Sequence, residues 1–330
     1  MPDLQIMTRA ALEAMRQALD LVPEDSVLVV GDEASGACPD AFVAAARDHG
    51  CHADIFRLPE SDRPLTSLPD GMLDLLEGRD VIINAIAGRS DEIPFRLKWI
   101  HAIEARDLRM GHSPGIVDSM MEGGALDVDY ALMRRNAKHL IDLFRDADTV
   151  HITTAAGTDL VLGLAGRPFV SDAHITDTER GVNLPCGELY CCPLEDRADG
   201  VLVVDGCFGS DGNVPAPATL TCRGGRAVDV ASDDPALTAR INELLDTDDG
   251  ARTIAELGIG LNPGAGLHGN MLEDEKALRT AHIAFGSNKG MPGGRSRSST
   301  HIDYLFHRPT MVVTRTDGSI ARVMDDGDFA

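Results

Sequence analysis

The chain has 330 residues, which is long enough for two domains with cores of their own. Its formal net charge at pH 7 is -23, from 53 acidic and 30 basic residues. This charge argues against nucleic acid as a partner, because contacts to phosphate require a basic surface.

The N-terminal part alternates helical and strand patterns. The expected elements are a helix over 7–20 with Thr8 as its cap, a strand over 26–31, a helix over 39–49, strands over 53–58 and 81–86, and helices over 94–107 and 126–146. Alternating β and α segments with fully apolar strands imply an α/β domain with a doubly wound, mostly parallel sheet. We place this domain at residues 1–147.

From Thr149 onward the apolar runs shorten and glycines multiply. Strands are expected over 201–206 and 218–222, and Gly224-Gly225 is typical of a tight hairpin turn. A helix over 234–246 interrupts this pattern. Residues 148–330 are therefore predicted to form a β-rich α+β domain.

The seven cysteines form no CxxC pair, which argues against a disulfide framework and against a thiolate zinc site. The first residues lack the basic start and apolar run of a signal peptide. No stretch approaches the ~20 apolar residues of a membrane helix. These features favour a cytoplasmic protein without a membrane partner.

Nucleotide binding is also disfavoured. The first strand is followed by Gly-Asp-Glu-Ala-Ser-Gly over 31–36, which does not match G-x-G-x-x-G and brings two acids where a pyrophosphate would lie. No Gly-Lys-Ser/Thr triplet follows any strand.

Side chains that bind metals recur in the last quarter of the chain. Glu256, His282 and the pair His301 and Asp303 each lie beside a short apolar stretch typical of a strand or a strand end, with glycine close by. Since a strand alternates its faces, His301 and Asp303 point to the same side and can hold one ion. Imidazoles together with carboxylates suit zinc, manganese, cobalt or iron.

Two further glutamates have competing explanations. Glu188 lies at the start of a short strand with apolar neighbours, where it is either a ligand or a solvated surface acid. Glu275 lies in Glu-Asp-Glu-Lys over 273–276, where an acid can serve either chemistry or the start of a helix.

Six segments taken together resemble the M29 family of metallopeptidases, the aminopeptidase T-like enzymes. They are Gly157–Leu160, Asn183–Glu188, Glu256–Pro263, Glu273–Lys276, His282–Gly286 and His301–Asp303. The resemblance covers roughly residues 126–325. It implies a two-domain homodimer with a dinuclear site for divalent ions in the C-terminal domain, removing N-terminal residues from peptides.

The resemblance also implies roles for single residues. Glu188, Glu256, His282, His301 and Asp303 fall on the metal-ligand positions, and Glu275 becomes the catalytic acid–base residue. Glu275 stands seven residues before His282, two more than the corresponding glutamate of the peptidases, and Lys289 replaces their tyrosine.

Two alternatives remain open at this stage. The chain also resembles the hydroxypyridine ring-cleaving dioxygenases, which share the fold and hold one Fe(II); here His282, His301 and Asp303 would be its ligands. The other alternative is a metal-stabilised oligomer without enzymatic activity.

Overall fold

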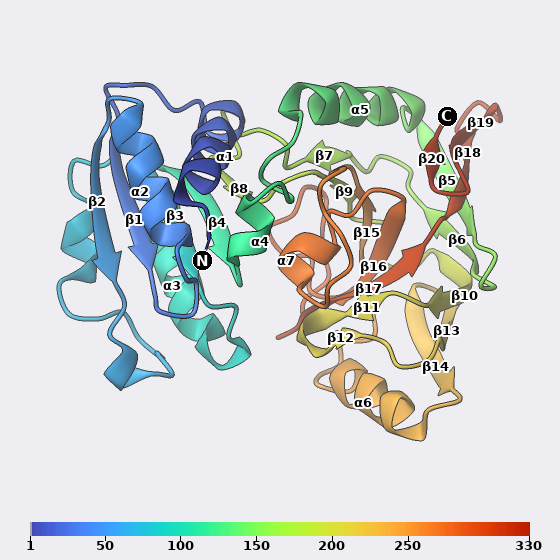
Figure 1. Ribbon diagram of the computed structural model, residues 1–330. Coiled ribbons are helices and arrows are strands. Elements are labelled where there is room, and N and C mark those ends of the chain that lie inside the picture. Colours follow the sequence, from blue (N-terminus) through green and yellow to red (C-terminus); the bar gives the residue numbers. More distant parts are fainter. Residues whose placement is uncertain (1) are drawn as a thin grey trace. The chain divides into compact units, whose positions relative to one another are not determined.

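The computed structural model describes residues 2–330, which form two compact units (Figure 1). The first unit extends to Arg134 and adds Asp172–Cys186 and Asn262–Ala265. The second contains Arg135–Ser171, Gly187–Leu261 and Gly266–Ala330. The single boundary at residue 147 stays a prediction.

The first unit is built on a five-stranded sheet with the order β2-β1-β3-β4-β8. Its strands are β1 (Ser26–Gly31), β2 (His52–Arg57), β3 (Val81–Ile86), β4 (Arg109–Pro114) and β8 (Gly181–Asn183). Each neighbouring pair is parallel. The predicted parallel α/β sheet is therefore confirmed, and β4 is a strand that the apolar pattern did not predict.

Four α-helices belong to the first unit: α1 (Leu4–Ala18), α2 (Cys38–Asp48), α3 (Ile93–Glu104) and α4 (Asp118–Met121). Helix α5 (Tyr130–Leu143) starts at the end of this unit, and its residues Ala137 and Leu140 pack in the core of the second unit. Short 3₁₀ turns lie at η1 (Glu60–Asp62), η2 (Met72–Leu76) and η3 (Ser90–Glu92). Leu28 and Val30 of β1 share a buried cluster with Phe95 and Trp99 of α3. Helix α5 continues into the second unit and is shorter than the predicted 126–146 helix.

The prediction that Thr8 caps the first helix was wrong. The helix begins one turn earlier, where the Asp3 side chain accepts hydrogen bonds from the backbone N–H groups of Gln5 and Ile6, at 3.0 and 3.3 Å. An aspartate is a strong N-cap because its carboxylate satisfies N–H groups that have no partner within the helix.

The second unit contains two largely antiparallel sheets. The eight-stranded sheet has the order β14-β13-β10-β6-β5-β18-β19-β20. Its strands are β5 (Ala147–Thr153), β6 (Asp159–Gly163), β10 (Ala198–Val204), β13 (Ala218–Arg223), β14 (Arg226–Ser232), β18 (Thr310–Arg315), β19 (Ile320–Asp325) and β20 (Asp328–Phe329). Gly224 and Gly225 join β13 to β14 with φ of 52° and 79°, which explains glycine at both positions of the predicted hairpin.

The seven-stranded sheet has the order β12-β11-β17-β16-β15-β9-β7. Its strands are β7 (Val170–Ser171), β9 (Glu188–Cys191), β11 (Cys207–Phe208), β12 (Gly212–Asn213), β15 (Ile254–Gly260), β16 (Thr280–Gly286) and β17 (His301–His307). Figure 1 shows β15, β16 and β17 together in orange and red, with the short helix α7 (Met271–Asp274) nearby and α6 (Pro235–Leu245) in yellow-orange. Apolar side chains from both sheets, such as Leu162, Leu220, Ile259 and Phe306, form one buried cluster. The β-rich C-terminal part predicted from the sequence is confirmed.

Among residues 2–330, no helix is both long and apolar enough to cross a membrane.

Candidate metal centre

Four neighbouring strands of the seven-stranded sheet carry the predicted ligands. Glu188 begins β9, Glu256 lies in β15, His282 in β16, and His301 and Asp303 in β17. The antiparallel register pairs Gly258 with His282, Ala284 with Asp303, and Gly260 with Glu188. Residues that are more than 110 positions apart in sequence are thus brought to one place by strand pairing.

The side chains of these residues converge. The Nε2 atom of His282 lies 2.9 Å from Oε1 of Glu188 and 4.0 Å from Oε1 of Glu256. The Nε2 atom of His301 lies 3.0 Å from Oε2 of Glu256 and 3.4 Å from Oδ1 of Asp303.

Two groups of three residues meet the spacing that a metal ion requires. One comprises Glu188, Glu256 and His282, and the other comprises Glu256, His301 and Asp303; within each, the potential ligand atoms lie within 4.8 Å of one another. We call the first group the inner position and the second the outer position. Glu256 belongs to both.

The two positions differ in their exposure to solvent. The side chain of His282 is 1% exposed, whereas that of His301 is 33% exposed. Glu188, Glu256 and Asp303 are all buried. Three buried carboxylates so close together are unfavourable without cations to balance them.

The orientation of His301 suits a metal ligand. Its Nδ1 atom lies 2.7 Å from the carbonyl oxygen of Ser287, which can only accept a hydrogen bond, so Nδ1 carries the proton. Nε2, on the side of Glu256 and Asp303, is then the nitrogen that offers a lone pair in the neutral ring.

Electrostatics also favour cations at this place. Burial alone lowers the pKa of His282, but the Glu188 carboxylate, with smaller contributions from Asp303 and Glu256, raises the pKa of His282 to about 9. Burial raises the pKa of Glu256, and the Glu188 charge adds to this effect against the His301 hydrogen bond. The buried acids thus create a strongly negative potential where the two imidazoles meet them.

Gly258 leaves the space that the His282 ring occupies. A Cβ atom at this position would lie 2.1 Å from both Cε1 and Nε2 of His282 and 2.6 Å from Oε1 of Glu188. A side chain at position 258 would therefore fill the inner position. Together with the donor types, this clearance shows that the residues present fit divalent ions.

Gly258→Ala is expected to displace His282 and Glu188 and to weaken metal binding at the inner position by at least about tenfold, since a misplaced ligand loses its coordination geometry. Metal titration followed by calorimetry checks this. Gly266→Ala, where the added Cβ meets only the far end of the exposed His268 side chain, is the control for the loss of a glycine in the same unit. Unchanged binding in Gly258→Ala would show that the inner position is not built around His282.

Lys276 is a residue of this site that the sequence did not predict. It is 1% exposed, and its Nζ atom donates to Oε2 of Glu188 at 2.7 Å and to Oε1 of Glu275. The chain has only four lysines, and this one follows three acids, Glu273 to Glu275. That pattern alone does not predict burial, because a lysine is seldom buried unless it is paired.

The structure places Glu275 beside the metal groups but in neither of them. Its side chain is 14% exposed and pairs with Lys276. Burial raises the pKa of Glu275 to about 8 against the opposing charge of Lys276, and the charges of Glu188 and Asp303 contribute to the rise. Glu275 and the predicted ligand Glu188 therefore share the ammonium of Lys276.

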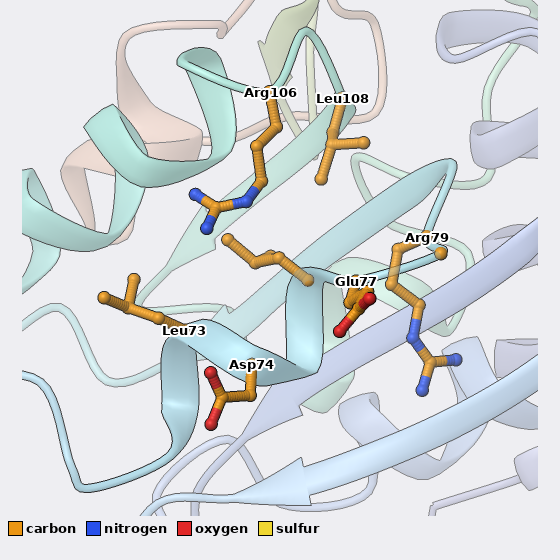
Figure 2. Close-up of a pocket in the computed structure, with 8 residues that line it drawn as sticks. Leu73, Asp74, Glu77, Arg79, Arg106 and Leu108 are labelled. Carbon is orange, nitrogen blue, oxygen red and sulfur yellow. The ribbon is translucent and has the colours of Figure 1, made fainter.

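The first unit has a surface hollow of about 380 Å³ in a different place (Figure 2). It is lined by acids and arginines together with leucines, including Asp74, Glu77, Arg79 and Arg106. Arg79 already pairs with Asp54 at 2.6 Å, and Arg106 donates to the carbonyl oxygen of Ala102. None of the predicted ligands lines this hollow.

Known proteins resemble this chain in sequence or in fold. It is 32% identical over 171 residues to aminopeptidase T of Thermus aquaticus, which covers 46% of this chain and 41% of that protein. It is 26% identical over 200 residues to aminopeptidase AmpS of Bacillus subtilis, covering 53% of this chain and 48% of that protein. The chain spans about half the length of the curated relatives it matches.

Two solved structures have the same fold over nearly their whole length. The 2,5-dihydroxypyridine dioxygenase from Pseudomonas putida KT2440 has a TM-score of 0.75 at 18% identity, covering 99% of this chain and 98% of that one. Wild-type AmpT from Thermus thermophilus has a TM-score of 0.73 at 18% identity, covering 99% of both chains. At this identity the two structures show the fold alone.

The family model of the thermophilic metalloproteases (M29) matches residues 131–329, which include all five predicted ligands and Glu275. This match extends over more than half of the chain. The chain therefore belongs to the M29 family.

Proposed function

We propose that this protein is a metal-dependent hydrolase of the aminopeptidase type with two divalent ions. The observation that carries the proposal is the pair of three-residue groups that share Glu256. Oε1 of Glu256 lies 4.0 Å from Nε2 of His282 and Oε2 lies 3.0 Å from Nε2 of His301, so this carboxylate could serve both positions. Membership of the M29 family and the aminopeptidase relatives support the same reaction.

Divalent ions bound at these positions would supply Lewis-acid polarisation of a carbonyl and would lower the pKa of a nearby water. Glu188, Glu256, His282, His301 and Asp303 would hold them. Glu275 accepts a proton from the water that attacks the scissile carbonyl carbon. It returns that proton to the amine nitrogen as the C–N bond breaks, so that the residue ends in its starting state.

The relatives indicate the substrate class, because the two named above are aminopeptidases. Glu188, Glu256 and Asp303 carry the negative charge that two divalent ions would balance, and Lys276 pairs with Glu188 and Glu275. We therefore propose peptides or small aminoacyl amides as substrates, with zinc, manganese or cobalt as the ions, in a cytoplasmic homodimer.

The ring-cleaving alternative needs a single ion on His282, His301 and Asp303. The Nε2 atoms of both histidines also face carboxylates outside that triad, namely Glu188 at 2.9 Å and Glu256 at 3.0 Å. A facial triad keeps the remaining positions open for oxygen and substrate. The carboxylate-rich donor set therefore favours the hydrolase.

The test is metal removal and return on tag-free protein. Metal content is measured on freshly purified, anaerobically prepared protein; the protein is then stripped with a chelator and assayed with aminoacyl amides as zinc, manganese or cobalt is added back. We expect two ions per chain and hydrolysis that returns with them. One iron per chain together with oxygen uptake on hydroxylated pyridines would contradict the proposal, and so would metal binding that changes only the melting temperature.

A further inference from the structure

Lys276 contacts a predicted ligand of the inner metal position. Its ammonium contacts Oε2 of Glu188 at 2.7 Å, and Glu188 belongs to the inner position alone. At the outer position, His301 pairs with Glu256 and Asp303, and Nε2 of His282 lies 3.9 Å from Oδ1 of Asp303. The ammonium of Lys276 therefore places a positive charge beside the inner position.

The contact with Lys276 reduces the number of carboxylate oxygens with which Glu188 can coordinate an ion. Oε2 accepts from Lys276, while Oε1 lies 2.9 Å from Nε2 of His282. One oxygen is thus available to the inner position. The ammonium also offsets the charge of that carboxylate, whereas Asp303 at the outer position has no lysine as an ion-pair partner among the described contacts.

The ammonium is held rigidly in this place. The Lys276 side chain is 1% exposed and donates to both Glu275 and Glu188. These two carboxylates are also shielded from solvent: the Glu275 side chain is 14% exposed and that of Glu188 is 7% exposed. In such surroundings water screens charges weakly, so the repulsion between the ammonium and an inner ion is strong. The exposure of His301 makes the outer position the more accessible one as well.

We propose that Lys276 makes the two metal positions unequal, so that the outer position binds its ion first and tightly and the inner position binds its ion weakly and reversibly. This inference rests on the proposed dinuclear function. Lys276 is a positioning residue: it acts through Glu188 and through its charge. Activity then follows the occupancy of the inner position and depends on the free metal concentration.

The experiment is a Co²⁺ titration of the chelator-stripped, full-length protein, followed by calorimetry and visible absorption. We expect two dissociation constants that differ by about 10- to 100-fold, the range typical of residues that support metal ligands. In Lys276→Met the two dissociation constants are expected to differ by no more than about threefold, because the inner position should then bind Co²⁺ more tightly. Lys276→Arg keeps the charge and should keep the two constants apart.

A second variant pair keeps the inference testable if Lys276→Met does not fold. Glu188→Gln is expected to lose the weak constant and keep the tight one, while Asp303→Asn loses the tight one. Two ions bound with equal affinity in the native protein, or a weaker inner site in Lys276→Met, would overturn the inference and leave the dinuclear hydrolase standing. Failure of the native protein to bind any Co²⁺ would instead overturn the proposed function, and the inference with it.

Discussion

Glu256→Gln is expected to abolish metal binding at both positions and to reduce hydrolysis by at least about 100-fold, beyond the 10- to 100-fold typical of residues that only support ligands. Glutamine has nearly the same shape, so the strand and its packing remain. What is lost is the charge of the one carboxylate that the inner and outer positions share. No other single change within the site removes a ligand from both groups.

Metal content and melting temperature check this result together. Ions that bind only the native state stabilise it by mass action, by roughly 2.7 kcal/mol for each ion at a hundred times its dissociation constant. Added zinc should therefore raise the melting temperature of the native protein and leave that of Glu256→Gln unchanged. Glu243→Gln removes a carboxylate whose side chain is 70% exposed on α6, and it should behave as the native protein does. Unchanged metal content and turnover in Glu256→Gln would refute the shared-ligand arrangement.

The strands that carry the site were predictable because they are apolar runs flanked by glycine. The run from Ile254 to Gly260 is buried throughout, and so is the run from Thr280 to Gly286. Their periodicity and glycines indicate strands, and the alternation of faces places His301 and Asp303 side by side. The assignment of these residues as ligands still stays a prediction until metal is measured.

Elements whose stability comes from distant partners were not predictable in this way. Strand β4 reads Arg-Met-Gly-His-Ser-Pro, which lacks a strand pattern, yet it pairs in parallel with β3 on one side and β8 on the other. Its strand conformation is imposed by those two neighbours, and tertiary context of this kind overrides local propensity.

Lys276 escaped prediction for a related reason. Its burial depends on Glu188, which lies 88 residues earlier in the chain. A lysine is expected at the surface unless a partner is known. The role of Gly258 is likewise visible only once β15 and β16 are paired, because the clash it avoids is with the His282 ring across the strand pair.

Glu275→Gln is expected to lower kcat by about 100- to 10,000-fold while leaving the metal content at two ions per chain, since positioned acid–base residues contribute effects of that size. The carboxylate lies outside both metal groups and pairs with Lys276. Glutamine keeps the oxygen that accepts from Lys276 but cannot take up a proton from water. KM should change little, because the substrate's contacts with the metal positions remain.

Glu273→Gln provides the matched control on the same short helix. Glu273 is 4% exposed and accepts a hydrogen bond from the backbone N–H of Gly266 at 3.0 Å, which glutamine can also do. The turnover of Glu273→Gln should stay within about twofold of the native value, because the substitution changes one hydrogen bond from a backbone N–H and that bond lies outside both metal groups. If Glu275→Gln lost metal along with activity, Glu275 would be a ligand and the acid–base role would fall to another group. If instead it kept both, the proton would be carried by solvent, and the placement of Glu275 between Lys276 and the buried acids would serve only to balance charge.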